Sequence, residues 1–261
     1  MLSGEFRQIV PTRRGTCLQS QVARCVFKVR QDVCVNLATL LQPWIKLQYD
    51  ELCTALSDLG DPENVHVARV RARRLRSVLG GWHLHLPPHA PKLRRRLQEL
   101  GRSISALRDI DVIHELISLD PPDDLPQWEA LLAQQRAPLL ASAREVASSS
   151  SVHQLLLDLH ALAYSNWGSI GRLDVEPIAH EVFDAEQARL SDLEANAIDT
   201  HDVRKGAKRL RYNAEVLAPK IAESEAVAIR AEQMQQSMGS SLDSEMVESW
   251  LTQARLAQGV R

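Results

Sequence analysis

Residues 66–76 have the sequence HVARVRARRLR, and residues 201–211 have the related sequence HDVRKGAKRLR. Helix-start residues precede both segments, Asp61-Pro62 in the first case and Asp199-Thr200 in the second. At about 100° per residue, a histidine and three cations of each segment share one stripe of the helix surface. These residues are His66, Arg69, Arg73 and Arg76 in the first segment and His201, Arg204, Lys208 and Arg211 in the second. The sequence therefore predicts two amphipathic helices, each with a cationic face.

The cationic stripe of the first helix lies in a stretch without acidic residues. From Asn64 to Gln98 there is no Asp or Glu, although the stretch contains nine Arg and Lys residues. Solvated helix faces usually mix charges, because like charges at i,i+4 each cost a few tenths of a kcal/mol. Arginine's planar fork also suits bidentate contacts with phosphate. The repeated column favours an external anion as its partner, and an internal network of salt bridges is the alternative.

The composition restricts where such an anion could bind. The formal net charge is −2 and the pI is about 6.5, so affinity for a polyanion must come from local segregation of charge. The hydrophobic fraction of 44% is enough for a folded core. We find no secretory signal and no long uncharged apolar run, and we expect a protein of the cytoplasm that does not bind membranes. The cysteines, which we expect to be buried free thiols, are Cys17, Cys25, Cys34 and Cys53.

The spacing of apolar residues predicts an all-α protein. Apolar residues recur at intervals of three and four, and no segment alternates with period two. Proline and glycine clusters separate roughly eight predicted helices. The acidic, proline-containing segment 120–124 is the best candidate boundary, because one copy of the basic helix lies on each side of it. The two halves are interpreted as an ancient duplication.

The paired segments resemble those of the CHAD domain, whose name stands for conserved histidine α-helical domain. The resemblance also includes Asp61 to Val65 before the first segment, Tyr212 after the second, and Leu107 to Val112. It implies one domain over residues 1–261, built as two pseudo-symmetric four-helix bundles around a central basic channel or groove. The first half would cover residues 12–120 and the second residues 125–258. The resemblance further implies binding of inorganic polyphosphate in the cytoplasm, often at polyphosphate granules.

By this resemblance, ten residues would line the polyphosphate site. They are His66, Arg69, Arg73, Arg74, Arg76, His201, Arg204, Lys208, Arg209 and Arg211. Arg74 and Arg209 point away from the stripe, so contact at the rim of the site and bracing of an acidic residue such as Asp109 are both open. Lys205 and Gly206 depart from the first copy, and glycine inside a helix costs about 1 kcal/mol relative to alanine. We therefore expect the first half, with its basic segment 92–96, to contribute more of the binding.

Two other functions use the same charges. A nucleic-acid-binding protein would need exposed aromatic side chains for stacking, and aromatic residues make up only 4% of the chain. An enzyme acting on phosphate chains would need carboxylates that hold a metal, and we find no Walker loop and no E-x-E-x-K motif. His83, His85 and His89 lack the clear ligand spacing of a metal site. The prediction is a non-enzymatic protein without cofactor or metal, and the sequence identifies no protein partner.

Overall fold

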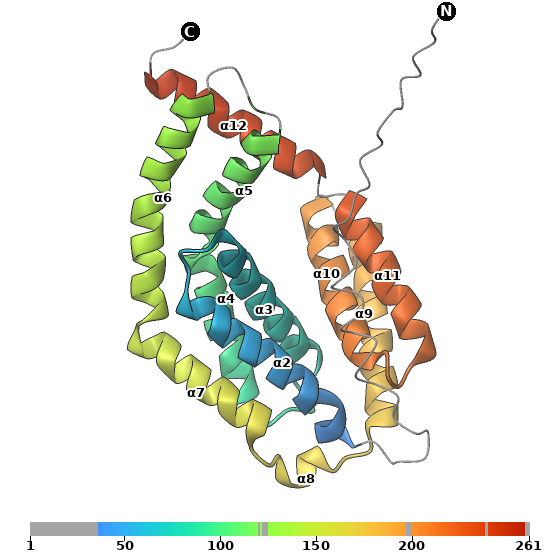
Figure 1. Ribbon diagram of the computed structural model, residues 1–261. Coiled ribbons are helices and arrows are strands. Elements are labelled where there is room, and N and C mark those ends of the chain that lie inside the picture. The colour runs from blue at the N-terminus through green and yellow to red at the C-terminus, as the bar shows by residue number, and fades with distance from the viewer. Residues whose placement is uncertain (1–35, 120, 122–124, 197–199, 238–239, 259–261) are drawn as a thin grey trace, which may run out of the picture. The chain divides into compact units, whose positions relative to one another are not determined.

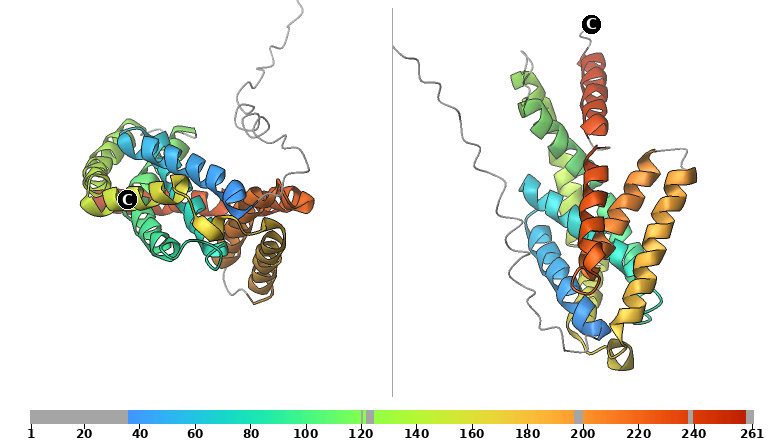
Figure 2. Two further views of the ribbon diagram at one scale, coloured as in Figure 1. Left: turned by 90° about the horizontal axis from the view of Figure 1, so that it is seen from below. Right: turned by 90° about the vertical axis from the view of Figure 1, so that its right-hand side faces the viewer.

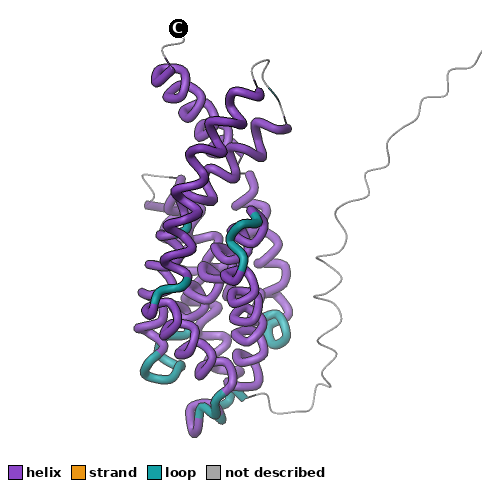
Figure 3. The backbone as a smooth tube through the Cα atoms, turned by 60° about the vertical axis from the view of Figure 1, so that its left-hand side comes forward, coloured by secondary structure: helices purple, strands orange, loops and turns teal. Residues whose placement is uncertain are grey.

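The computed structural model describes residues 36–119, 121, 125–196, 200–237 and 240–258, and Val35–Arg261 forms one compact unit. Apart from short connections and one isolated bridge between Asn36 and Asp174, the described chain is helical (Figure 1, Figure 3). The helices are α2 (Leu37–Ser57), α3 (Pro62–Gly81), α4 (Ala90–Ser103), α5 (Ser105–Leu119), α6 (Leu125–Ala147), α7 (Ser150–Tyr164), α8 (Gly168–Gly171), α9 (Val175–Asn196), α10 (Thr200–Leu217), α11 (Ala222–Ser237) and α12 (Ser240–Gln258). The predicted all-α class is confirmed. Cys17, Cys25 and Cys34 lie outside the described residues.

Capping residues fix where the helices begin. The side chain of Asp61 accepts a hydrogen bond from the backbone N–H of Glu63 at 2.9 Å, and Pro62 occupies the first turn of α3. Ser149 likewise accepts from the N–H of Val152 at 3.3 Å and starts α7. The described chain contains more helices than the roughly eight predicted, and the division of residues 90–119 into α4 and α5 is one that no predicted break marked. The predicted break at Ser148 to Ser151 lies between α6 and α7.

Helix α3 lies between two groups of helices. It packs against α2, α4 and α5 on one side and against α10 on another (Figure 1). Helix α7 packs against both α2 and α4, so α2, α3, α4 and α7 form a four-helix arrangement. Helices α9 and α11 lie beside α10 (Figure 2). Helix α7 follows segment 120–124 but packs on α2 and α4, which precede that segment. The division into halves at 12–120 and 125–258 stays a prediction.

A smaller apolar cluster joins α12 to α5 and α6. Its buried residues are Ile113, Ile117 and Leu132, and Trp250 of α12 packs against it. The rings of Trp128 and Trp250 meet edge to face with centroids 5.9 Å apart. The C-terminal helix is therefore held by helices from the middle of the chain.

Glycines allow α10 to approach its neighbours closely. A Cβ on Gly81 of α3 would lie 2.5 Å from Oδ1 of Asn213, and a Cβ on Gly206 of α10 would lie 2.7 Å from Cδ1 of Leu193 on α9. Gly206 thus has a packing function that offsets its low helix propensity. The two contacts set α10 directly against both α3 and α9.

None of the helices in the described part of the chain combines the length and the apolar character that a membrane span requires.

Candidate anion-binding site

A pocket of about 240 Å³ lies between α3, α4, α10 and the start of α5. We call it the basic pocket. Its titratable lining residues are Arg69, Arg73 and Arg76 of α3, Arg102 of α4, and His201, Lys205 and Lys208 of α10. Ser77, Leu97, Gln98, Gly101 and Ser105 complete the wall. The structure thus brings both copies of the repeated segment to one place.

The helix period explains why these cations meet. On α3, Ala68, Ala72 and Leu75 are at most 1% exposed and pack into the core, so the arginines between them lie on the other face. On α10, Ala207 and Ala214 are fully buried in the same way. Two apolar faces packed on neighbouring helices therefore leave two basic faces beside each other.

Arg69 is anchored at one end of the basic pocket. Its Nη1 donates to the backbone carbonyl of Ser105 at 2.8 Å and to Oδ1 of Asp109 at 3.2 Å. Burial lowers the pKa of Arg69, and the carboxylate of Asp109 opposes part of that effect. Arg69 therefore fixes α3 to the start of α5 and is partly neutralised.

The middle of the basic pocket holds positive charge without an acidic counterpart. Among the residues that the structure describes, Arg73, Arg76 and Arg102 form no ion pair and no side-chain hydrogen bond. The pKa of Arg76 is lowered first by burial and then by its neighbours Arg73, Arg94, Arg102 and Arg209, all of them cations. This mutual repulsion would be relieved by an anion in the pocket.

Arg209 is turned toward α9. Its Nε donates to Oε2 of Glu186 at 2.7 Å and its Nη2 donates to Oε1 at 2.5 Å. Glu186 is 5% exposed, so the pair is largely removed from water. This geometry is a bidentate contact with an internal carboxylate.

Arg74 and Arg211 share one internal carboxylate. Arg74 of α3 forms an ion pair with Oε2 of Glu215, and Nε of Arg211 donates to Oε1 of Glu215 at 2.9 Å. Nη2 of Arg211 also lies 2.9 Å from Oε1 of Glu232 on α11. Both guanidinium groups lie over the buried ring of Tyr212. Arg74 and its counterpart Arg209 therefore brace Glu215 and Glu186, and not Asp109, while their contact with a ligand at the rim stays a prediction.

His66 and Arg204 lie outside the lining of the basic pocket. His66 is exposed on the first turns of α3, and its pKa is lowered by desolvation and then by the charge of Arg108. Arg204 is partly buried and its Nε has no hydrogen-bond partner among the described atoms. The part of these two residues in anion binding stays a prediction.

Sequence reasoning did not identify Arg102 and treated Lys205 only as a departure from the repeat. Arg102 follows the acid-free stretch, after Glu99, and has no counterpart in the repeated segment. The apolar spacing of Leu93, Leu97 and Leu100, all at most 2% exposed, is the signal that could have placed it on the outer face of α4.

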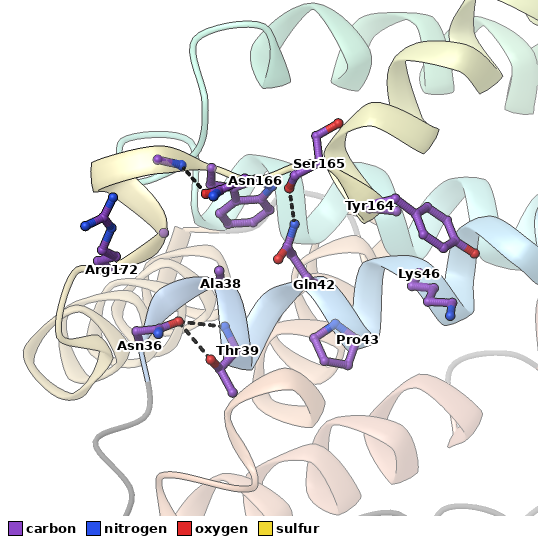
Figure 4. Close-up of a pocket in the computed structure, with 14 residues that line it drawn as sticks. Asn36, Ala38, Thr39, Gln42, Pro43, Lys46, Tyr164, Ser165, Asn166 and Arg172 are labelled. Atoms are coloured by element: carbon purple, nitrogen blue, oxygen red, sulfur yellow. Dashed lines mark hydrogen bonds between the residues drawn. The ribbon is translucent and has the colours of Figure 1, made fainter.

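A larger, more open pocket of about 770 Å³ lies between α2 and the α7–α8 connection (Figure 4). Its polar groups largely bond to each other: Nε2 of Gln42 donates to the carbonyl of Ser165 at 2.7 Å, and Oδ1 of Asn166 accepts from Gly168 at 2.8 Å. Lys46 lies over the ring of Tyr164, 5.0 Å from its centroid. This pocket therefore lacks the concentration of cations that marks the basic pocket.

The histidine-rich connection between α3 and α4 has other contacts. Nδ1 of His83 lies 3.1 Å from the carbonyl of Gly80, and Nε2 of His85 lies 3.6 Å from Oε2 of Glu181. Within the described ranges, no group of three or more His, Cys, Asp or Glu side chains has the arrangement of a metal site.

The fold and the site together define an all-helical domain whose basic pocket is built from a repeated helix. The sequence profile of the CHAD domain matches residues 44–252, which is most of the chain, and the chain therefore belongs to the CHAD domain family. Among solved structures it is similar to the CHAD domain from the plant Ricinus communis, with a TM-score of 0.70 and 20% identity over 88% of this chain and 83% of that chain. That similarity supports the fold. A search of curated proteins found no match.

Proposed function

We propose that this protein binds inorganic polyphosphate in the basic pocket without acting on it chemically. The observation that carries the proposal is the convergence of Arg73, Arg76 and Arg102 where no described carboxylate neutralises them. Membership of the CHAD domain family supports the choice of ligand. A polyphosphate chain offers a closely spaced row of negative charges, and arginine binds phosphate oxygens through charge-assisted hydrogen bonds.

The lining of the basic pocket favours polyphosphate over nucleic acid. Sequence-tolerant binding of single strands uses aromatic side chains on which bases stack. Among the described lining residues, the imidazole of His201 is the only aromatic ring, and the other side chains are cationic, small or polar apart from Leu97. Such a surface suits a ligand that consists of phosphate groups alone.

The charges also favour binding over catalysis. Phosphoryl transfer is assisted by metal ions that carboxylates and phosphate oxygens hold in place. The described lining contains no Asp or Glu, and Asp109 at its edge is bonded to Arg69. On the basis of the family resemblance we further propose a cytoplasmic location, at polyphosphate granules.

The test is a titration of the whole chain with long-chain polyphosphate, single-stranded DNA and duplex DNA at several salt concentrations. We expect the tightest binding for polyphosphate and an affinity that falls as salt rises, because bound counterions are released. A parallel assay with Mg²⁺ should detect no release of orthophosphate. Tighter binding of either DNA would refute the choice of ligand, and release of orthophosphate would refute the non-catalytic role.

A double variant tests the location of the site. Arg73→Glu with Lys208→Glu should abolish polyphosphate binding and leave the helical circular dichroism signal unchanged, since both side chains line the pocket and lie outside the core. The matched control is Arg95→Glu with Arg230→Glu, which makes the same charge change at exposed positions of α4 and α11. Equal losses in the two double variants would mean that net charge, and not the pocket, governs binding.

A further inference from the structure

Beyond the basic pocket, a guanidinium group of α4 lies over the C-terminal end of α3. A Cβ on Gly80 would lie 3.2 Å from Nε of Arg94 and 3.5 Å from Nη1 of Arg209. Gly80 is buried, and the absence of a side chain lets both guanidinium groups approach the same point of the α3 backbone. Helices α4 and α10 therefore each bring a cation to the C-terminal end of α3.

The two cations at Gly80 differ in their partners. Arg209 is held by the buried carboxylate of Glu186. Arg94 is exposed and, within the described part of the chain, forms neither an ion pair nor a side-chain hydrogen bond. Arg94 is thus a cation beside Gly80 with its donors still available to a ligand.

Arg76 connects this point to the basic pocket. It lines the pocket, and its charge interacts with both Arg102, another lining residue, and Arg94. Arg69, at the other end of the pocket, precedes Gly80 by roughly three helical turns, which is a distance of about 16 Å along the helix axis. Uncompensated positive charge therefore continues along α3 past the end of the pocket.

The second half of the chain does not repeat this arrangement. Arg211 corresponds to Arg76 in the repeated segment, and α11 follows α10 as α4 follows α3. Arg211, however, contacts the carboxylates of Glu215 and Glu232. The second half neutralises the position that the first half leaves positive, so a long anion leaving the basic pocket is attracted along α4 and not along α11.

We propose that Arg94, lying over Gly80, forms a second phosphate subsite that only polyphosphate chains long enough to extend beyond the basic pocket can occupy. The inference rests on the proposed function and adds a basis for selection by chain length. Tripolyphosphate is shorter than the stretch from Arg69 to Gly80, so when it is bound among Arg69, Arg73 and Arg102 it does not reach Arg94. A long chain occupies the pocket and continues to Arg94.

The test compares Arg94→Gln, Arg102→Gln and Arg95→Gln, each titrated with tripolyphosphate and with long-chain polyphosphate. Arg94→Gln should weaken long-chain binding about tenfold, the usual value of one charged hydrogen bond, and leave tripolyphosphate binding unchanged. It should also reduce the slope of log affinity against log salt by about 1 for the long chain only. Arg102→Gln should weaken both ligands.

Arg95→Gln is the matched control, because Arg95 is the next residue on α4, carries the same charge and has a side chain that is 84% exposed beside Glu99. It should change neither affinity more than about twofold. Equal effects of Arg94→Gln on both ligands, no effect on either, or an effect no larger than that of Arg95→Gln would overturn the subsite. A wild-type protein that binds neither ligand would instead overturn the proposed function.

Discussion

Glu186 of α9 is the carboxylate that neutralises Arg209 beside the second phosphate subsite, and its replacement should change stability and affinity in opposite directions. Glu186 is 5% exposed and the side chain of Arg209 is 19% exposed, so the ion pair is shielded from water. Removing one member of such a pair costs about 3–5 kcal/mol, because the remaining charge is left uncompensated. Since Glu186→Gln keeps one oxygen acceptor, we expect a loss of about 3 kcal/mol.

Urea unfolding followed by far-ultraviolet circular dichroism measures this loss. With a urea m-value near 3 kcal/mol per molar for a chain of this size, the midpoint should fall by about 1 M. The affinity for long-chain polyphosphate should rise, because Arg209 then adds an uncompensated cation near Gly80. Saturating polyphosphate should restore part of the lost stability, since a ligand that binds only the folded state stabilises it.

Glu181→Gln is the control for this prediction. Glu181 is also on α9, but its side chain is 61% exposed and its Oε2 lies 3.6 Å from Nε2 of His85. Its replacement should therefore shift the urea midpoint little. A midpoint for Glu186→Gln no lower than that for Glu181→Gln would refute the reasoning that the Arg209 pair stabilises the packing of α9 on α10. A fall in polyphosphate affinity would refute the placement of Arg209 beside the ligand.

Two further predictions concern stability. Gly101→Ala should stabilise the protein by about 0.5 kcal/mol through helix propensity, because a Cβ there meets no atom within 4 Å. Gly206→Ala should destabilise it by about 1–3 kcal/mol by crowding α9, and urea midpoints that shift in the same direction would contradict this contrast. His66 has a pKa lowered by desolvation and by Arg108, so the unfolded chain binds more protons as pH falls through 6.5. Wild type should therefore lose more stability below that pH than His66→Asn, and equal losses in urea titrations at matched pH would refute this.

The sequence was sufficient to predict the basic face of α3. Helical period is a local property, and the apolar residues Ala68, Ala72 and Leu75 identify the buried side without knowledge of any other helix. Arg69, Arg73 and Arg76 must then lie opposite. The same reasoning placed His201 and Lys208 on the matching face of α10, and the structure brings both faces to one pocket. The family followed from the repeated segment and the all-α class from the spacing of the apolar residues, and both are confirmed.

The partners of the remaining arginines could not be predicted in this way. Arg74 pairs with Glu215, a residue of α10 that is far away in the sequence, and only the packing of α3 on α10 brings them together. Arg209 of α10 and Glu186 of α9 are likewise brought together only by the packing of α9 on α10. The sequence pattern shows which direction a side chain takes from its helix. It does not show whether a carboxylate occupies the space into which the side chain points.

Because the neighbouring helices decide which charges surround each arginine, a repeated motif can give an asymmetric site. Arg76 and Arg211 have the same place in the repeated segment, yet Arg211 forms an ion pair with Glu232 of α11, whereas the charges of Arg94 and Arg102 of α4 lower the pKa of Arg76. The difference lies in the helix that follows each copy, not in the copy itself. An arginine near a carboxylate strengthens the fold, and an arginine near other cations creates a place for an external anion. The two basic helices are similar in sequence, and the charges of the neighbouring helices determine which of their arginines keep a positive charge without a described carboxylate beside it.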